Sequence, residues 1–365
     1  MTYETEFEMF ISLQAMQIRG GTSKGVYLLR DDLTAYADSL DDVLSALMGG
    51  APRQVDGLGG DATTTSKVAI VGCSHEEDVD VDYLFAQVDP KTGAVDWTPT
   101  CGNVLAGVGP FAIERGLVPV AGATTDVRIR LVNTGARVVA SVQTPSGAVE
   151  YGGDQAIAGV HGGAAPVRLT FTDFAGGTTG ALFPTGNRVD HIDGVEVSCV
   201  DAGVCAIIMR AADLGLSGAE TPAEINGDGA LLVRVERIRC KAGELMGMGD
   251  VSGRVVPKVM LVSDSSAGSS ADIRSRYLVP TSCHPAHAVT GAINLASAVS
   301  IPGTVAHEFR STTGDRSIGI EHPGGVLKLG IALDGDAPIG ATITSTARKL
   351  FDGNAFVEVH PTAAC

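Results

Sequence analysis

A cysteine, a glycine and an asparagine stand together at the start of a small-residue stretch, in TPTCGNVLAGVGPFAIERGL (residues 98–117). The polar turn followed by this stretch predicts a helix that begins near Cys101. N–H groups at a helix start stabilise negative charge, so a thiol placed there becomes more acidic. Gly102 and Asn103 leave room and donors for a substrate oxygen. The pattern favours a proton-transferring thiol over its alternative, a small cysteine that is buried in the core.

Lys67 is the second candidate for proton transfer, because it opens the otherwise apolar strand KVAIVG (67–72). A solvated charge at a strand edge is the alternative, but desolvation in a cleft would make this lysine a base. Two loops rich in glycine and hydroxyl groups, RGGTSKG (19–25) and DGLGGDATTTSK (56–67), add N–H groups, hydroxyls and cations. Such loops suit carboxylates. Their predicted binding residues are Arg19, Ser23, Thr64 and Ser66.

Histidines give a weaker signal. His284 and His287 form an HxxH pair near a second Pro-Thr turn, but no third ligand follows at the usual metal spacing. The sequence therefore predicts no metal site. We expect His284 to hydrogen-bond the substrate and His287 to pack, and His322 is a further candidate for binding a carboxylate.

The charge balance limits the partners. The 26 basic and 42 acidic residues give a net charge of −16, which disfavours nucleic acid and anionic membrane surfaces. The seven cysteines are scattered and form no CxxC pair, so neither a disulfide framework nor a zinc knuckle is expected. No apolar run approaches a membrane span, and no secretory leader is visible. We expect a cytoplasmic enzyme with a small anionic substrate.

The chain is expected to be α+β, with short Val- and Ile-rich strands, GAVEYGG (147–153) among them, broken by glycine turns. Helices are predicted over residues 40–50, 103–117, 230–247 and 287–299, with Leu231, Leu232, Val235, Ile238 and Leu245 forming the apolar face of the third. None of this resembles an alternating βαβ chain.

The two halves of the chain resemble each other in three places. SKVAIVG matches PKVMLVS, which places Lys258 where the first half has Lys67; PTCGNVLAGVG matches PTSCHPAHAVTG; IRGGTSKGVYLL loosely matches VDAGVCAIIM. The pattern predicts a duplicated domain, with halves at 1–185 and 186–365, a crossover near FPTGN (183–187), and a final stretch of roughly 20 residues that returns to the first half. A cleft between the halves would hold the site.

Several segments, in order and spacing, resemble the PrpF-type isomerases: RGGTSKGVYLL, VDGLGGDATTTSKVAIV, CGNVLAGVGPFAIERGL, FPTGN and SCHPAHAVTGAI. That family includes 2-methylaconitate isomerase, methylitaconate Δ-isomerase and 4-oxalomesaconate tautomerase, and it is similar to diaminopimelate epimerase. The resemblance implies two pseudo-symmetric domains. In each, a mostly antiparallel sheet curls around a central helix, and the active site lies between the domains.

The resemblance also implies a cofactor-independent shift of a proton and a double bond in a small unsaturated tricarboxylate, with Lys67 and Cys101 as the acid–base pair. SVQTPSGAVEY and GMGDVSGRVVPK look most like 4-oxalomesaconate tautomerases of bacterial aromatic-acid breakdown. The substrate would be held by these residues: Arg19, Ser23, Thr64, Ser66, Gly102, Asn103, Thr185, Lys258, Ser282 and His284.

Three alternatives stay open from the sequence. The substrate could be 2-methylaconitate or methylitaconate. An amino-acid epimerase on the same fold would need two facing thiols, and the sequence leaves open which of Ser282, Cys283 and His284 faces the cleft. A carboxylate-binding protein without activity is the third. The oligomeric state is also open, with a homodimer as one option.

Overall fold

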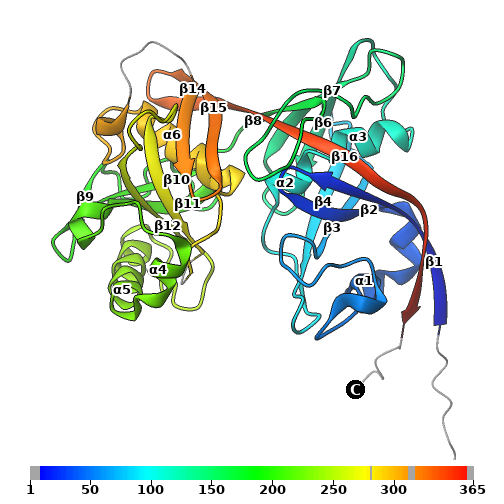
Figure 1. Ribbon diagram of the computed structural model, residues 1–365, viewed down its shortest axis with the longest axis horizontal. Coiled ribbons are helices and arrows are strands. Elements are labelled where there is room, and N and C mark those ends of the chain that lie inside the picture. Colours follow the sequence, from blue (N-terminus) through cyan, green and yellow to red (C-terminus); the bar gives the residue numbers. More distant parts are fainter. Residues whose placement is uncertain (1–8, 280–281, 311–316, 360–365) are drawn as a thin grey trace, which may run out of the picture. The chain divides into compact units, whose positions relative to one another are not determined.

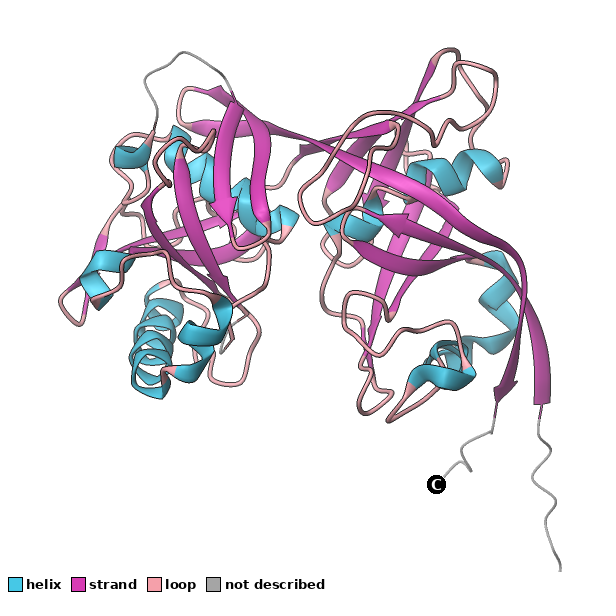
Figure 2. Cartoon of the chain, in the orientation of Figure 1, coloured by secondary structure: helices cyan, strands magenta, loops and turns pink. Residues whose placement is uncertain are grey.

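The computed structural model describes residues 9–279, 282–310 and 317–359 (Figure 1). The protein is mixed α+β, and strands make up most of its regular structure (Figure 2). Contacts divide the chain into two compact units. Unit 1 comprises Met1–Ala156, Val160–Leu169 and Ser345–Cys365, and unit 2 comprises Ile157–Gly159 and Thr170–Thr344.

Unit 1 is built on a sheet whose strands are β1 (Met9–Gly20), β2 (Ser23–Leu29), β3 (Lys67–Cys73), β4 (Val81–Val88), β6 (Thr124–Leu131) and β7 (Arg137–Gln143), with the short β5 (Val95–Asp96) beside β4. Its helices are α1 (Leu40–Met48), α2 (Gly102–Leu105) and α3 (Val108–Glu114). One face of the sheet packs on α2 and α3, and the other packs on α1 through a separate apolar cluster.

Unit 2 contains the strands β9 (Asp190–Ile192), β10 (Val195–Ala202), β11 (Val204–Arg210), β12 (Lys258–Asp264), β13 (Ile273–Leu278), β14 (Ser317–His322) and β15 (Gly325–Asp334). Its helices are α4 (Pro222–Gly227), α5 (Gly229–Leu245) and α6 (Val289–Ser300). Every residue of α6 except Thr290 is buried, as expected for an apolar helix enclosed by a sheet. Two strands, β8 (Pro166–Thr172) and β16 (Ala337–Val359), have residues in both units.

The two units repeat one pattern of strand pairing. In unit 1, β1–β2 is antiparallel, β2–β3 parallel, β3–β4 antiparallel, β4–β6 parallel and β6–β7 antiparallel. In unit 2, β10 to β15 pair in the same succession. Lys67 lies opposite Gly25, the third residue of β2, and Lys258 lies opposite Ala206, the third residue of β11. The short sequence repeats thus mark equivalent places in the two sheets.

Some sequence predictions need correction. The helix predicted over 103–117 is two helices, because α2 ends at Leu105 and α3 begins at Val108. Residues 147–153 form turns and irregular backbone instead of a strand, with Gly147 at φ 77°. Leu245 is 55% exposed at the end of α5, whereas Leu231, Val235 and Ile238 are buried as predicted. Among the described helices, none has the length and apolar character needed to cross a membrane.

Candidate functional site

Lys67 shares a face of the unit 1 sheet with several of the predicted site residues. Directly paired residues lie on the same face of a sheet, and residues two apart on a strand do so too. Lys67 pairs with Gly25 on β2 and with Gln87 on β4. Ser23 is therefore on the Lys67 face, as is Tyr27, whose partner is Ala69. This is the face that α2 and α3 cover.

The ammonium of Lys67 has a defined position. Its Nζ donates to Oε1 of Gln87 at 2.6 Å and lies 5.1 Å from the centroid of the Phe85 ring. Gln87 is itself held, because its Nε2 donates to the carbonyls of Ser66 at 2.8 Å, Thr63 at 3.2 Å and Val88 at 3.2 Å. With its amide so anchored, Gln87 can present only its oxygen to the lysine. The half-buried Lys67 is thus oriented without a carboxylate partner among these contacts.

Cys101 occupies the N-cap of α2 and is half-buried. Its carbonyl accepts the Tyr83 hydroxyl at 3.3 Å, and the Tyr83 ring lies 6.5 Å from that of Phe85. A continuous set of contacts therefore joins Lys67 to Cys101 through Phe85 and Tyr83. The N–H groups of a first helical turn have no acceptor within the helix, so Gly102 and Asn103 supply donors beside the thiol.

Tyrosine hydroxyls and a glycine turn fix the start of α2. The hydroxyl of Tyr27 donates to the Val104 carbonyl at 2.5 Å, and burial, with Cys101 as a second cause, raises the pKa of Tyr27 well above 10. A Cβ at Gly21, whose φ is 53°, would lie 2.3 Å from Oδ1 of Asn103. Nδ2 of Asn103 donates to the Thr22 hydroxyl at 3.0 Å. The first glycine loop and the Cys-Gly-Asn segment are therefore packed together.

The second glycine-rich loop (residues 56–67) contacts the first through a backbone hydrogen bond. The N–H of Lys24 donates to the Thr64 carbonyl at 2.9 Å. Ser66 is fully buried, and its hydroxyl donates to Oε1 of Gln54 and to the Ala62 carbonyl. Ser66, predicted to bind substrate, thus uses its side chain to hold the loop. Thr64 is half-exposed beside the first loop.

Arg19 does not join these residues. It pairs with Lys24 on β2, and both lie one residue out of phase with Ser23 and Gly25, hence on the opposite face of the sheet. Its Nη1 donates to the Gly21 carbonyl and to the carbonyl and hydroxyl of Thr346. The structure thus separates Arg19 from the group of Lys67, Ser23, Cys101, Gly102 and Asn103.

The remaining predicted binding residues lie in unit 2. Thr185, in the FPTGN turn, donates its hydroxyl to Asp190 at the start of β9 at 2.7 Å. Lys258 begins β12, and Ser282 is exposed. His284 is half-buried, and its Nδ1 accepts the N–H of Ala286 at 2.9 Å. The Thr185 hydroxyl and the His284 ring therefore each stabilise the turn to which they belong.

Cys283 differs from Cys101. Its side chain is 4% exposed and belongs to the apolar cluster that packs α5 against the sheet of unit 2. Its Sγ donates to the His284 carbonyl at 3.7 Å. Burial raises the pKa of the Cys283 thiol to about 11, although Arg276 opposes the shift. This thiol is a packing group.

Within the described ranges, no group of three or more His, Cys, Asp and Glu residues could hold a metal ion. His287 packs, as expected, 4.8 Å from the Tyr277 ring and with Nε2 3.2 Å from the Ser275 hydroxyl. Burial lowers its pKa to about 3, and burial also lowers the pKa of His322 to about 4.

Sequence reasoning missed Gln87, Tyr27 and Tyr83. Gln87 and Tyr83 lie in the β4 segment VDYLFAQV, and Tyr27 lies in the β2 segment GVYLL. Both segments form strands, and alternation puts their polar ends on one face. The signal that could have found them is a pair of tyrosines and one glutamine in otherwise apolar strands. The pairing of β2, β3 and β4 decides which loops lie beside these polar side chains.

Comparisons with known proteins show the family to which the chain belongs. Residues 10–358 match the family described as PrpF protein. The 4-oxalomesaconate tautomerase of Pseudomonas putida is 48% identical over 93% of this chain and 95% of that protein, and the (4E)-oxalomesaconate Delta-isomerase of Novosphingobium is 45% identical over 95% and 98%.

Solved structures of other proteins share the fold of this chain. The crystal structure of a methylitaconate-delta-isomerase superposes with a TM-score of 0.86 at 35% identity, covering 96% of each chain. A hydroxyproline epimerase from Agrobacterium vitis, at 14% identity and a TM-score of 0.53 over 99% of this chain and 94% of that one, shares only the fold. With the family match and these identities over nearly its whole length, the chain belongs to the PrpF family.

Proposed function

We propose that this protein is a cofactor-independent isomerase that moves a proton and a double bond in a small unsaturated tricarboxylate, with 4-oxalomesaconate as the first candidate substrate. The observation that carries the proposal is the placement of Lys67 and Cys101 on one face of unit 1, joined through Phe85 and Tyr83. The identity to the Pseudomonas putida tautomerase supports the choice of substrate.

The chemistry needs an acid, a base and donors for a developing oxyanion. A C–H that is α to a keto group and vinylogous to a carboxylate is acidic enough for a side-chain base. One of Lys67 and Cys101 removes this proton, which leaves a dienolate. The other returns a proton at a different carbon of the allylic system, so the double bond moves and the formula is unchanged. Gly102, Asn103 and Ser23 are the proposed donors to the enolate oxygen.

Gln87 completes the proposed catalytic face as a positioning residue. Because three carbonyls hold its amide, its oxygen fixes the direction of the Lys67 ammonium. A proton-transferring group held in one direction avoids the reorganisation that a mobile lysine would need at each turnover.

The family resemblance implies that residues of unit 2 also bind the substrate. Binding of the outer carboxylates by Thr185, Lys258, Ser282 and His284, in a cleft between two pseudo-symmetric halves, remains a prediction. Single substitutions Lys258→Met and His284→Asn should raise KM more than they lower kcat if these residues only bind substrate.

Proton NMR in deuterated water tests the proposal, with 4-oxalomesaconate, 2-methylaconitate and methylitaconate offered in turn. Isomerisation of 4-oxalomesaconate should move its double bond and label the carbon that gains the proton. Turnover of only 2-methylaconitate or methylitaconate would keep the reaction class and replace the substrate. Binding without any solvent exchange would identify a carboxylate-binding protein instead.

An epimerase is the less favoured alternative, and the burial of Cys283 is the specific reason. Two-base epimerisation by thiols needs a second thiol at the substrate, and Cys283 lies in an apolar cluster. Inversion of a single stereocentre in the same NMR experiment, with no movement of a double bond, would favour the epimerase.

A further inference from the structure

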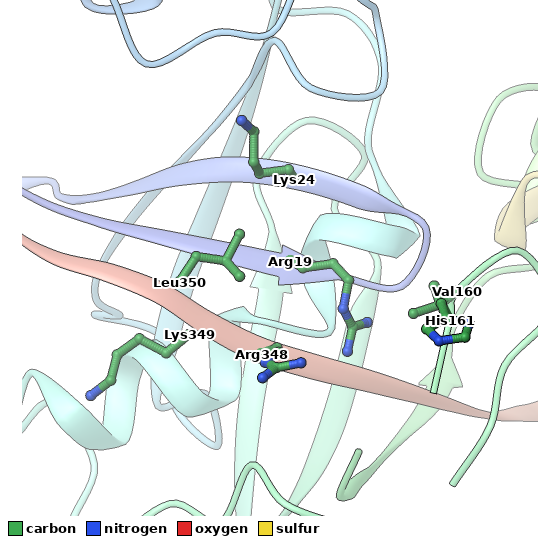
Figure 3. A pocket seen from close by; sticks show the side chains of 7 residues that line it. All are labelled: Arg19, Lys24, Val160, His161, Arg348, Lys349 and Leu350. Atoms are coloured by element: carbon green, nitrogen blue, oxygen red, sulfur yellow. The ribbon is translucent and has the colours of Figure 1, made fainter. Parts of the chain in front are cut away.

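A cavity lined largely by basic side chains lies in unit 1, on the face of β1 and β2 opposite the face that carries Lys67. It measures about 540 Å³ and is lined by Arg19, Lys24, Val160, His161, Arg348, Lys349 and Leu350 (Figure 3). None of the residues of the proposed catalytic face lines it. Arg19, which the sequence grouped with the substrate ligands, belongs here.

Strand register places three basic residues at paired positions beside this cavity. Arg19 on β1 lies directly opposite Lys24 on β2 and directly opposite Arg348 on β16. Like charges at paired positions repel each other, and the pKa of Arg19 is lowered by burial and by Arg348. Throughout the described segments, no ion pair involves Arg19, Lys24 or Arg348. Although the chain has a net charge of −16, this cluster of cations is therefore left without a carboxylate partner among the described residues.

The directions of the side chains indicate which of the cations could contact a bound anion. Figure 3 shows the Arg19 side chain extending toward β16, where the guanidinium of Arg348 lies, whereas the Lys24 ammonium points away from both. The ammonium of Lys349 points away from them, donates to Glu114 and lies 5.8 Å from the Tyr151 ring centroid. Lys349 is therefore already neutralised.

Arg19 is held in place for such a role. All three of its hydrogen bonds, to Gly21 and Thr346, use Nη1. These bonds fix the plane of the guanidinium, and its Nη2 and Nε donors are not used in them. Two neighbouring guanidinium groups match the oxygens of a phosphate or a carboxylate.

We propose that this cavity binds a small anion with two or more negatively charged oxygens, a phosphate or a polycarboxylate, between Arg19 and Arg348. The site is separate from the face that carries Lys67 and Cys101, so it does not depend on the proposed function. An anion here would neutralise the cluster and tie β16 to β1 and β2.

Isothermal titration calorimetry with inorganic phosphate, and separately with malonate, tests the site on four proteins: wild type, Arg348→Gln, Lys67→Met and Arg168→Gln. Arg348 is exposed, so its replacement should leave the fold intact, and circular dichroism checks this. Arg168 is an exposed arginine of the same unit and serves as the matched control. Arg348→Gln should weaken binding about tenfold or more, the effect expected for losing a hydrogen bond between charged groups.

Lys67→Met and Arg168→Gln should leave the dissociation constant within about twofold, because neither residue touches the cavity. Comparison of the two probes decides between phosphate and carboxylate as the preferred ligand chemistry. The proposal is overturned if the wild type binds neither probe, if Arg168→Gln weakens binding as much as Arg348→Gln, or if Lys67→Met removes binding. A Lys24→Gln variant with weakened binding would support it further.

Discussion

The starts of α2 and α6 occupy equivalent places in two sheets with the same pairing pattern, yet their cysteines differ. Cys101 caps a single helical turn, is half-buried and lies in contact with the set that includes Lys67. Cys283 precedes a twelve-residue helix, is 4% exposed and packs in an apolar cluster. The duplicated scaffold therefore carries a thiol at both places, but only Cys101 keeps part of its surface accessible, as the proposed proton transfer requires.

The lysines extend this comparison. Lys67 and Lys258 have the same register in their sheets, at the start of the third strand. Lys67 is directed by Gln87 and Phe85 from the neighbouring strand β4. The strand of unit 2 that corresponds to β4 is β13, whose sequence IRSRYL contains no glutamine. Duplication therefore preserves the backbone frame, whereas the residues on the neighbouring strand differ between the two units.

The same substitution at the two cysteines should give opposite results. Cys101→Ser should lower kcat by roughly two or more orders of magnitude, the usual size of an acid–base contribution, and Lys67→Met should do the same. Cys283→Ser should leave kcat within about twofold while lowering the free energy of unfolding by about 1–3 kcal/mol, since it buries a hydroxyl in an apolar cluster. Steady-state kinetics and thermal melts measure both. Equal losses of activity at the two positions would remove the distinction.

Gln87→Leu tests whether Lys67 needs its directed position. We expect kcat to fall about tenfold with little change in KM, because a positioning residue acts on the reacting geometry. Gln87→Glu should move the limb of the pH–rate profile that reports Lys67 to higher pH, since a carboxylate stabilises the ammonium form. Gln14→Leu, on the exposed side of β1, is the matched control and should leave kcat, KM and the pH–rate profile unchanged. An unchanged profile in Gln87→Glu would show that Gln87 only packs.

The two glycine turns offer a smaller contrast. Gly21 and Gly203 both have positive φ, 53° and 75°, so alanine should destabilise each unit by about 1–2 kcal/mol. An alanine Cβ at Gly21 would collide with Asn103 at 2.3 Å, whereas at Gly203 its nearest neighbour, the Thr290 carbonyl, is 3.2 Å away. Gly21→Ala should therefore lose activity as well as stability, and Gly203→Ala mainly stability. Kinetics and urea melts of both variants decide this.

The smallest expected effect is a pH dependence of stability that arises from the buried histidines of unit 2. Burial lowers the pKa of His287 to about 3 and of His322 to about 4, from 6.5. As pH falls below about 6.5, the unfolded chain takes up protons that the folded chain refuses, so stability should decrease from there down to pH ~4. His287→Gln should flatten this slope in thermal melts, and His75→Asn, at an exposed site, should not. A slope that is unchanged in His287→Gln would contradict the assignment.

Much of the fold could be predicted because hydrophobic periodicity is local. The helices predicted over 40–50, 230–247 and 287–299 are confirmed within a few residues as α1, α5 and α6. The failures have local causes as well: two small residues, Ala106 and Gly107, separate α2 from α3, and glycine turns replace the strand expected over 147–153. Propensity cannot locate such breaks when most residues nearby are small and apolar.

The candidate site was only partly predictable. Lys67, Cys101 and the glycine loops could be identified from residue types, but the face on which a side chain lies depends on register. Ser23 and Lys24 are neighbours on β2 and therefore lie on opposite faces of the sheet. Arg19 pairs with Lys24, so it lines the basic cavity and does not lie on the Lys67 face. Ser66 has the residue type of a ligand, and only the packing of Gln54 on its hydroxyl gives it a structural role.

By itself, the sequence determined the mixed α+β class, the internal repeat, the family and the residue types capable of proton transfer, because these depend on composition and short-range order. Tertiary structure alone decided which thiol is buried, which glutamine directs the lysine and which arginine stands apart. Each of these depends on contacts between segments distant in the chain, where strand pairing and packing place side chains that no local pattern can bring together.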